Sequence, residues 1–368
     1  MNNNKRLYII AGEPSGDFLG ASLIDSIRRH NKDVEIYGIG GDMMKSSGIK
    51  SLFDIQRISV GGIFEVVPHI FDIKNLIDKT VCDIIEKKPC VVVTIDSPGF
   101  CFRVAKKLRK LNINLKLIHY VAPSVWAWRK NRAKKIARLY DHLFTLFDFE
   151  VPYFEREKLE TTFIGHPAVE NFEFHDISSR RGNNDILIMP GSRLQEIKNL
   201  LPIFLEVASR NNFDNVIIPT FDHFIDDIQR YTSYYKDLNI IIETDEHKKK
   251  EYFYSSKLSI VSSGTATLQL ALSGCPMIVA YKISRLSYEI IKRLIKIKYI
   301  SLVNIIMNKK VVPEMIQKDC SCDKIDLELK NLDIDFQIDN FKNLRKHLIN
   351  NNKNPSDLAA EIILDKYL

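Results

Sequence analysis

Short, β-branched apolar runs alternate with longer amphipathic stretches along this chain, and this alternation constrains its fold more than any other feature. The runs are apolar on both faces, which is typical of strands in parallel sheets that helices cover on both sides. The series occurs twice within 368 residues, a length that suits two domains of ordinary size. We therefore predict an α/β chain with two doubly wound domains. The predicted strands are 6–12, 35–41, 90–96, 115–121, 142–147, 186–190, 215–220, 239–244, 258–262 and 277–281.

A polar stretch at 171–184, which contains the run S-S-R-R-G-N-N, predicts the join between the two domains. From Lys342 onward the chain returns to a helical pattern, which we expect to pack back on the first domain. The predicted first domain is therefore 1–170 completed by 342–368, and the predicted second domain is 171–341.

The composition is that of an ordinary globular protein, with 45% hydrophobic and 27% charged residues. The net charge of +7 fits nucleic acid, an anionic lipid surface or phosphorylated substrates, and charge by itself does not choose among them. Since no aromatic–basic stacking platform accompanies the basic stretches, we do not expect nucleic acid as a partner. The cysteines have no paired metal-ligand spacing and the histidines form no H-E-x-x-H motif, so these residues indicate no metal site. We expect no cofactor. No apolar stretch approaches the roughly 18 residues of a membrane span, and no signal peptide is evident, so we expect a cytoplasmic chain.

Two small-residue turns in the second half follow predicted strands and precede predicted helices. Gly191 and Ser192 offer backbone N–H groups, and the guanidinium of Arg193 has a fork geometry that suits phosphate oxygens. The second turn, at 263–265, directs amides and hydroxyls at the start of the next helix. Each turn by itself is also typical of an ordinary helix cap. Together, at the strand ends of one sheet, they predict a nucleotide-diphosphate cleft.

Carboxylates end two strands of the first half. The turn at 11–17 lacks a G-x-G-x-x-G fingerprint, and its Glu13 and Asp17 disfavour a bare phosphate and suit sugar hydroxyls. The alternative is a capped turn in which Asp17 lies near a helix start. Asp96 ends a strand of valine and isoleucine, where partial burial would raise its pKa toward that of a useful general base. The alternative for Asp96 is a cap on the following helix.

Two segments predict a surface for amphiphilic partners, and a third predicts a ligand-binding position. The stretch 60–71 is apolar and broken by glycines, and the helical pattern at 284–298 places basic side chains beside an apolar stripe, as in helices that lie on anionic lipid. Segment 119–129 holds both tryptophans, Trp126 and Trp128, just after a predicted strand, where α/β sheets bind ligands. The alternatives are a core-packed helix and a plug in a domain seam.

These motifs, in this order, resemble the lipid-A-disaccharide synthases, the bacterial glycosyltransferases of outer-membrane lipid A assembly. The resemblance extends from residue 11 to about residue 314, and the string H-Y-V-x-P-S-V-W-A-W at 119–128 is its most specific part. It implies the GT-B arrangement, in which two Rossmann-like domains face across a cleft and the C-terminal helix crosses back to the first domain. The other matching motifs are A-G-E-P-S-G-D at 11–17, V-G-G-I-F-E-V at 60–66, I-D-S-P at 95–98, I-G-H-P at 164–167, P-G-S-R at 190–193, S-G-T-A-T at 263–267, P-M-I-V-A-Y-K at 276–282 and Y-I-S-L-V-N at 299–304.

The resemblance also implies a reaction. An inverting transfer would join UDP-2,3-diacylglucosamine to 2,3-diacylglucosamine 1-phosphate (lipid X), form a β-1,6 link and release UDP without a metal. The first domain would bind the acceptor and face the membrane, and the second would bind the UDP-sugar. The chain would be cytoplasmic and peripherally associated with the inner membrane. A returning C-terminal segment would also allow a homodimer.

By the same resemblance, Asp96 is the base that takes the proton of the acceptor 6-hydroxyl, and Glu13 and Ser15 line the acceptor side. The residues expected to hold the donor are Gly191, Ser192, Arg193, Glu196, Ser263, Gly264, Thr265, Gln269 and Asn304. The residues expected to meet acyl chains or the membrane are Val60, Ile63, Phe64, Val66, Val67, Trp126, Arg285, Lys292 and Arg293.

Two positions depart from the family's pattern. Gly99 stands where the family usually has a second aspartate, which argues against a paired-carboxylate mechanism. Gln269 stands where the family has a glutamate that accepts ribose hydroxyls, which predicts weaker donor binding. Two other functions stay open: a UDP-sugar 2-epimerase on the same fold, and a non-catalytic, membrane-associated UDP-sugar binder.

Overall fold

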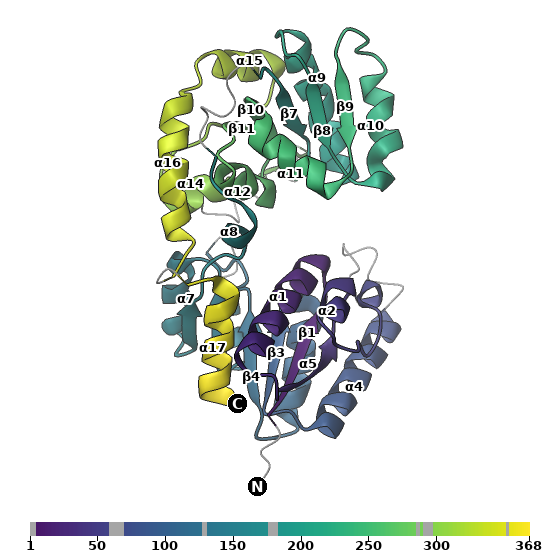
Figure 1. The fold of residues 1–368 in the computed structure, drawn as a ribbon, viewed down its shortest axis with the longest axis vertical. Helices are drawn as coiled ribbons and strands as arrows, with labels where there is room; N and C mark the ends of the chain where they lie inside the picture. Colours follow the sequence, from purple (N-terminus) through teal and green to yellow (C-terminus); the bar gives the residue numbers. More distant parts are fainter. Residues whose placement is uncertain are drawn as a thin grey trace. The chain divides into compact units, whose positions relative to one another are not determined.

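The structure is a computed structural model that describes residues 5–58, 70–126, 131–175, 183–284, 288–289, 297–350 and 353–368. The chain forms two compact units (Figure 1). Unit 1 comprises Met1–Pro167 and Leu348–Leu368, and unit 2 comprises Ala168–His347.

Unit 1 is built on a parallel sheet whose described strands follow the order β2-β1-β3-β4-β5-β6. Successive strands join through helices, as parallel pairing requires. Its elements are β1 (Arg6–Ala11), α1 (Pro14–His30), β2 (Glu35–Ile39), α2 (Asp42–Ser46), η1 (Ile55–Arg57), α4 (Ile70–Lys87), β3 (Val91–Ile95), α5 (Pro98–Lys110), β4 (Lys116–Tyr120), α6 (Asn131–Ala137), β5 (His142–Thr145), η3 (Asp148–Glu150), α7 (Val151–Glu155), β6 (Glu160–Phe163) and α17 (Pro355–Tyr367).

Alternate side chains of the unit 1 strands enter two separate apolar clusters. Ile9 and Val93 pack on the face that α1 and α17 cover, whereas Ile10 and Val92 pack on the face that α4 and α5 cover. Because side chains alternate across a strand, a strand buried on both faces needs apolar residues at every position. The run Val91–Ile95 meets this requirement, since all its residues are buried.

The C-terminal helix α17 returns to unit 1 and lies beside α1 (Figure 1), which confirms the predicted crossing back. Asp357 accepts hydrogen bonds from Ser26 and, at 2.6 Å, from Arg29 Nη2, both on α1. The return begins at residue 348 rather than at 342. Helix α16 (Ile334–His347) stays in unit 2 because the buried Gln337 side chain pairs with the backbone N–H and C=O of Met277, at 2.8 and 2.9 Å.

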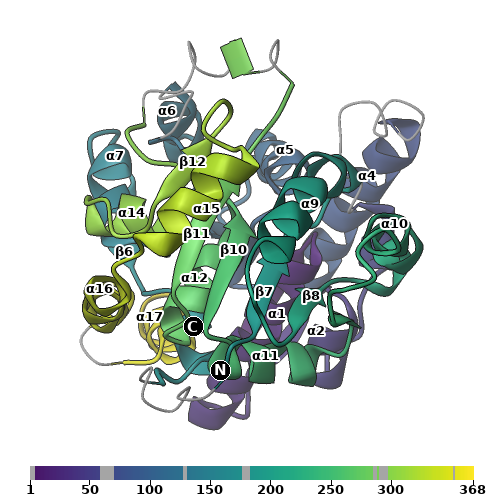
Figure 2. The same ribbon diagram turned by 90° about the horizontal axis from the view of Figure 1, so that it is seen from above.

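Unit 2 has a second parallel sheet, with its described strands in the order β12-β11-β10-β7-β8-β9. Counted along the unit, this is the usual Rossmann order 3-2-1-4-5-6 read in reverse. Helices α9 and α15 lie over one face, as Figure 2 shows. The elements are α8 (Ala168–Asn171), β7 (Ile186–Met189), α9 (Leu194–Ser209), β8 (Val216–Pro219), η5 (Asp222–Phe224), α10 (Ile225–Thr232), β9 (Ile240–Glu243), α11 (Glu246–Ser255), β10 (Leu258–Ser262), α12 (Thr265–Leu272), β11 (Met277–Tyr281), α14 (Leu302–Met307), β12 (Glu314–Ile316), α15 (Cys322–Lys330) and α16.

All ten predicted strands are present, and the predicted fold class of two Rossmann-like sheets is confirmed. The prediction missed β6 and β12, which lie at the edges of their sheets. Each is short and carries polar side chains, in E-T-T-F and E-M-I, because an edge strand pairs on one side and need not be buried throughout.

Candidate functional site

The two small-residue turns of unit 2 leave neighbouring strands at the same edge of the sheet. Strands β7 and β10 pair in parallel, and the chain continues from β7 toward one side of the sheet and from β10 toward the other. This is the topological switch point, where open α/β sheets bind ligands beyond the carboxyl ends of their strands. The sheet order therefore brings together two turns that are about seventy residues apart in sequence.

A cavity of about 610 Å³ opens at this switch point, a volume within the usual range of ligand pockets. Eight of the nine predicted donor residues line it, from the turn after β7, the turn after β10 and the helices that follow. These residues are Gly191, Ser192, Arg193, Glu196, Ser263, Gly264, Thr265 and Gln269.

Two glycines shape the floor of the cavity. Gly191 has a φ of +120°, and a Cβ there would lie 2.2 Å from Glu196 Oε2, so both the backbone and the space require glycine. Gly264 precedes α12, and a Cβ built on it would meet no atom within 4 Å. Its backbone therefore lies open to the cavity, and the first N–H groups of α12 are available to an anion.

Arg193 is an exposed, positively charged residue that lines the cavity. Its Nη1 donates to Glu196 Oε1 at 3.3 Å, while 77% of its side chain is exposed. An exposed pair of this kind contributes little to stability, so the guanidinium can move to a ligand at low cost. Ser263 is less free, because its hydroxyl donates to the carbonyl of Ile300 at 2.8 Å.

Helix α11 and the turn after β8 supply cavity residues that the sequence did not single out. Lys249 is buried, its Nζ lies 2.6 Å from Glu246 Oε1 and it sits 5.0 Å from the centre of the Phe221 ring. Phe221 is 48% exposed, and its ring is in contact with the Lys249 ammonium group and with the stacked ring of His223. The position of Phe221 just after strand β8 was the one sequence signal that could have identified it as a cavity residue. The burial of Lys249 depends on how α11 packs.

Asn304 was predicted to contact the donor, but its side chain is turned into the interior of unit 2. Its Nδ2 donates to Val312 O at 2.8 Å and Glu314 Oε1 at 2.9 Å, and its Oδ1 accepts from the N–H groups of Val311 and Val312 at 2.7 and 2.9 Å. The side chain is fully buried and does not line the cavity. Its amide fixes the segment before β12 instead.

Unit 1 has its own switch point, between β1 and β3, and Glu13 and Asp96 follow these two strands. Burial raises the pKa of Asp96, and this effect outweighs a hydrogen bond from the backbone N–H of Ser97, which lowers the pKa. The pKa of Glu13 is also raised, by the atoms packed around it and by the negative charge of Asp96. A carboxyl group whose pKa is raised by burial, beside a second one whose pKa its charge raises in turn, is typical of a site that accepts a proton.

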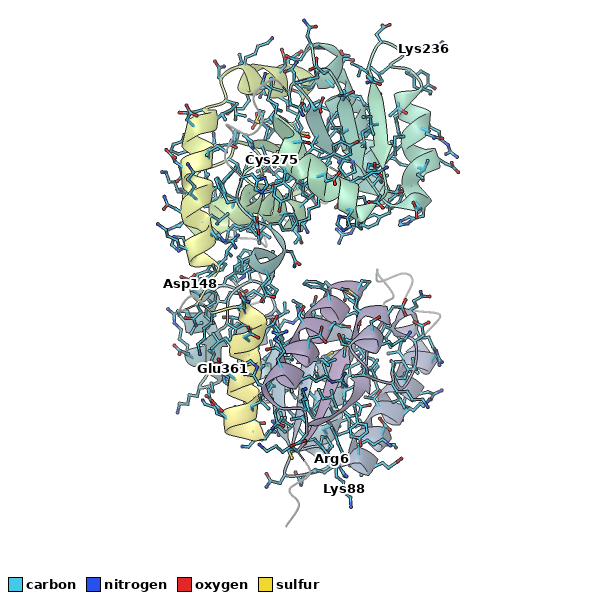
Figure 3. The ribbon with its side chains drawn as sticks, in the orientation of Figure 1. Arg6, Lys88, Asp148, Lys236, Cys275 and Glu361 are labelled. Carbon is cyan, nitrogen blue, oxygen red and sulfur yellow. The ribbon has the colours of Figure 1, made fainter. Side chains whose placement is uncertain are left out.

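The backbone at Asp96 is held in an uncommon conformation. Asp96 and Ser97 have φ values of +48° and +42°, a left-handed geometry that non-glycine residues rarely adopt. The Asp96 N–H donates to Tyr120 O at 3.0 Å, and a Cβ on Gly12 would lie 2.4 Å from Ser97 Oγ. The turns after β1 and β3 are therefore in close contact. Arg6 and Lys88 mark the opposite, amino-terminal edge of this sheet (Figure 3), where Arg6 Nη1 donates to Lys87 O at 3.2 Å.

The turn after β1 contains two other polar residues, Ser15 and Asp17, of which only Ser15 is exposed. Ser15 is exposed at the start of α1. Asp17 is buried, and its carboxylate accepts from the N–H groups of Gly41, Met43 and Met44 at 2.7–3.1 Å. It caps the start of α2 and is not available to sugar hydroxyls, so the capped-turn alternative is correct for Asp17.

Trp126 lies half-buried after β4 and contacts the segment after β5. Its Nε1 donates to Glu150 Oε1 at 3.2 Å, and its ring meets the edge of Phe149 at 5.6 Å between centroids. Burial raises the pKa of Glu150 to about 8, against hydrogen bonds from Trp126 and from the backbone N–H groups of Phe147 and Leu146. Glu150 is therefore a buried carboxyl group that is largely protonated at neutral pH.

This pKa predicts how stability changes with pH. Between the ordinary value near 4.5 and the folded value near 8, the unfolded chain has released the Glu150 proton and the folded chain retains it. Stability should therefore fall as pH rises through this window, by up to about 1.4 kcal/mol per pH unit from this group, and level off above it. Urea unfolding of the parent and of Glu150→Gln, measured from pH 5 to 9, checks this. The stability difference between the two should shift in favour of Glu150→Gln as pH rises, and a constant difference would contradict the assignment.

The remaining predicted membrane contacts lie outside the described residues. These are Val60, Ile63, Phe64, Val66, Val67, Arg285, Lys292 and Arg293. In the part of the chain that the structure describes, no helix is long and apolar enough to cross a membrane. Within the same residues, no group of histidine, cysteine and carboxylate side chains is placed to hold a metal ion.

Comparison with known proteins connects this geometry to a family. A family model described as lipid-A-disaccharide synthetase matches residues 7–365. A lipid-A-disaccharide synthase from Rickettsia prowazekii is 42% identical over 390 residues, which cover 99% of this chain and all of that protein. The same enzyme from Rhodospirillum centenum is 37% identical, over 98% of this chain and 94% of its own length. The chain belongs to the lipid-A-disaccharide synthetase family. Membership over the full length identifies it as a glycosyltransferase.

Solved structures of other proteins have the same fold as this chain. Acinetobacter baumannii MurG superposes with a TM-score of 0.60 at 12% identity, over 98% of this chain and 99% of its own. UDP-GlcNAc 2-epimerase from Neisseria meningitidis, bound to UDP-GlcNAc, also gives 0.60, at 15% identity and 98% coverage of both chains. At such identities the likeness shows the fold alone, which is the GT-B class.

The surroundings of Gly99 leave room for a larger residue. Gly99 is exposed near the start of α5, and a Cβ there would meet no atom within 4 Å. There is therefore space for a side chain at position 99. Glycine leaves Glu13 and Asp96 as the carboxylates of the described residues that follow β1 and β3 at this edge.

Proposed function

We propose that this chain transfers 2,3-diacylglucosamine from UDP to the 6-hydroxyl of 2,3-diacylglucosamine 1-phosphate, with inversion, and releases UDP. The observation that carries the proposal is the cavity at the unit 2 switch point, which gathers eight of the nine predicted donor residues around an open helix N-terminus. The relatives' names support a disaccharide product, since proteins named lipid-A-disaccharide synthase match this chain over 100% and 94% of their own length.

The donor would lie in the unit 2 cavity with its diphosphate at the start of α12. The N–H groups that follow Gly264 carry the positive end of the helix dipole, and Arg193 adds a charged fork. Together they would neutralise the charge that develops on the departing UDP, which is a role that a metal ion performs in other enzymes. The exposed part of the Phe221 ring, with Lys249 beside it, would contact the base.

The acceptor would bind at the unit 1 switch point, with Asp96 as general base. The 6-hydroxyl gives its proton to Asp96, and its oxygen attacks the anomeric carbon from the face opposite UDP. The bond from that carbon to the phosphate oxygen breaks, and the electron pair leaves with UDP. The raised pKa of Asp96 suits this task, since a stronger base accepts the proton more readily. Because both substrates carry acyl chains, we infer that the chain works at the surface of the inner membrane.

The direct test is release of UDP from purified protein and both lipid substrates in the presence of a chelator. No release with well-dispersed lipids would contradict the proposal. Turnover of water-soluble UDP-N-acetylglucosamine without lipid would favour the 2-epimerase alternative, whose fold matches equally well. Tight UDP binding with no turnover of either substrate would favour the non-catalytic binder.

Gln269 lines the donor cavity, so restoring the family's carboxylate should strengthen donor binding. A hydrogen bond to a charged acceptor is about 1 kcal/mol stronger than one to a neutral acceptor, so Gln269→Glu should lower the Kd of UDP about fivefold. Isothermal titration with UDP checks this, and Gln269→Ala serves as the control that weakens binding. Equal affinity in the parent and Gln269→Glu would place the ribose elsewhere.

A further inference from the structure

Four aromatic rings form a continuous row across the carboxyl ends of β4, β5 and β6. Trp126 meets Phe149 edge to face at 5.6 Å and 82°, and Phe149 stacks on Phe147 at 5.4 Å and 7°. Phe147 in turn lies 5.5 Å from His166. The row links two motifs of the sequence that the proposed chemistry does not use, the tryptophan segment and the I-G-H-P segment at 164–167.

Glu150 holds one end of this row. One carboxyl oxygen accepts from Trp126 Nε1 at 3.2 Å, and the other accepts from the Phe147 N–H at 3.4 Å. The same side chain therefore ties the loop after β4 to the turn after β5. Asp148 begins this turn and is labelled in Figure 3.

The loop that carries Trp126 also holds the proposed base. It follows Tyr120, the last residue of β4, whose carbonyl accepts from the Asp96 N–H at 3.0 Å. Val121 then adopts a φ of +81°, and its N–H donates to Phe144 O at 3.1 Å, on the neighbouring strand β5. Trp126 thus follows directly from the edge of the sheet where Asp96 lies.

The surface that Trp126 offers to a ligand is apolar. Its one polar atom already donates to Glu150, and the rest of the half-buried side chain is indole ring. A ring whose N–H is fixed in this way has one orientation and presents hydrocarbon. An acyl chain is the part of the proposed acceptor that such a surface suits.

We propose that Glu150 is a positioning residue, which holds the Trp126 indole so that its ring contacts an acyl chain of the lipid acceptor. This proposal rests on the proposed function for the identity of the acceptor. A buried carboxyl group is costly unless its hydrogen bonds are used, and here the bonds that it makes join the two loops. Removing the carboxyl group should release the indole and weaken binding of the acceptor. The donor cavity should not change, because it belongs to unit 2.

The test uses a Trp128→Phe parent, which leaves Trp126 as the only tryptophan of the chain. Titration with 2,3-diacylglucosamine 1-phosphate should change the Trp126 emission in a saturable way. Loss of one buried hydrogen bond predicts an increase of about tenfold in the acceptor Kd for Glu150→Ala. Glu150→Gln retains an oxygen for the indole N–H and should stay within about threefold. Glu155→Ala, which removes an exposed carboxylate on α7, is the matched control and should match the parent.

Kinetics of UDP release separate positioning from a general structural effect. Glu150→Ala should raise the KM of the acceptor about tenfold and leave kcat and the donor KM within about threefold. Trp126→Phe keeps a ring but loses the N–H, so it should give the same shift, and combining the two changes should add nothing further. If Glu150→Ala does not fold, Trp126→Phe alone carries this comparison.

Two results would overturn the inference. One is an acceptor Kd that is unchanged in Glu150→Ala, or an emission of Trp126 that the lipid does not alter. The other is a donor KM that rises as much as the acceptor KM. A parent that binds the lipid but releases no UDP would contradict the proposed function instead, and the binding titrations would still test the role of Glu150.

Discussion

Replacing Asp96 with alanine is expected to lower the rate of UDP release, at saturating substrates, by at least about 100-fold. This is the low end of what a well-placed general base contributes. Asp96 follows β3 at the switch point of unit 1, and burial raises its pKa. Without it, the acceptor hydroxyl would have to lose its proton to water. Single-turnover measurement of UDP formation in quenched samples reports this step separately from product release.

The isosteric change Asp96→Asn is the matched control, because it retains size and hydrogen bonding and removes basicity. It should be as slow as Asp96→Ala. In the parent the rate should fall as pH is lowered through the raised pKa of Asp96, since a protonated carboxyl group accepts no proton. A rate in either variant within tenfold of the parent would remove Asp96 from the role of base. The neighbouring Glu13 would then be the next candidate.

Arg193→Ala is expected to lower the transfer rate about 100- to 1,000-fold, the range seen when one hydrogen-bond donor to a developing negative charge is removed. Arg193 lines the donor cavity, and 77% of its side chain is exposed. Its loss would leave the helix N-terminus alone to neutralise the departing diphosphate. We expect thermal stability to be almost unchanged, because its ion pair with Glu196 is exposed.

Two further variants decide whether the guanidinium acts by its charge or by its geometry. Arg193→Lys retains the charge but loses the fork, so it should recover part of the rate. Arg210→Ala removes an exposed arginine that pairs with Glu206 and Asp323 away from the cavity lining, and it should keep the parent rate. An equal loss in Arg193→Ala and Arg210→Ala would mean that net charge, and not the site, is responsible.

The sequence predicted the sheets well because burial on both faces leaves a local signal. In Val91–Ile95 every position must be apolar, and such a run is visible without any partner. The edge strands β6 and β12 escaped notice, since a strand with one neighbour retains polar residues. The boundary at Lys342 was wrong because the helical pattern is continuous there. Helix α16 belongs to unit 2, where the Gln337 side chain accepts from the Met277 N–H and donates to the Met277 carbonyl.

The candidate sites divide in the same way. Glycine and hydroxyl residues at strand ends predicted the donor turns, and family motifs added Glu196 and Gln269. Neither signal identified Lys249 or Glu150, whose roles depend on burial by residues distant in sequence. The same limit explains the errors at Asp17 and Asn304. A polar residue in a motif has the same sequence signature whether it faces a ligand or the backbone of a neighbouring loop.

The sequence by itself determined the class of fold, the two turns that line the proposed donor cavity and the family to which the chain belongs, because each of these is recorded in short, local patterns. Only the tertiary structure decided that β7 lies beside β10, and β1 beside β3, so that residues far apart along the chain share one edge of a sheet. It also decided which polar side chains are free to act. Whether a carboxylate meets water, a ligand or a backbone amide depends on neighbours that the fold, and not the local sequence, brings to it.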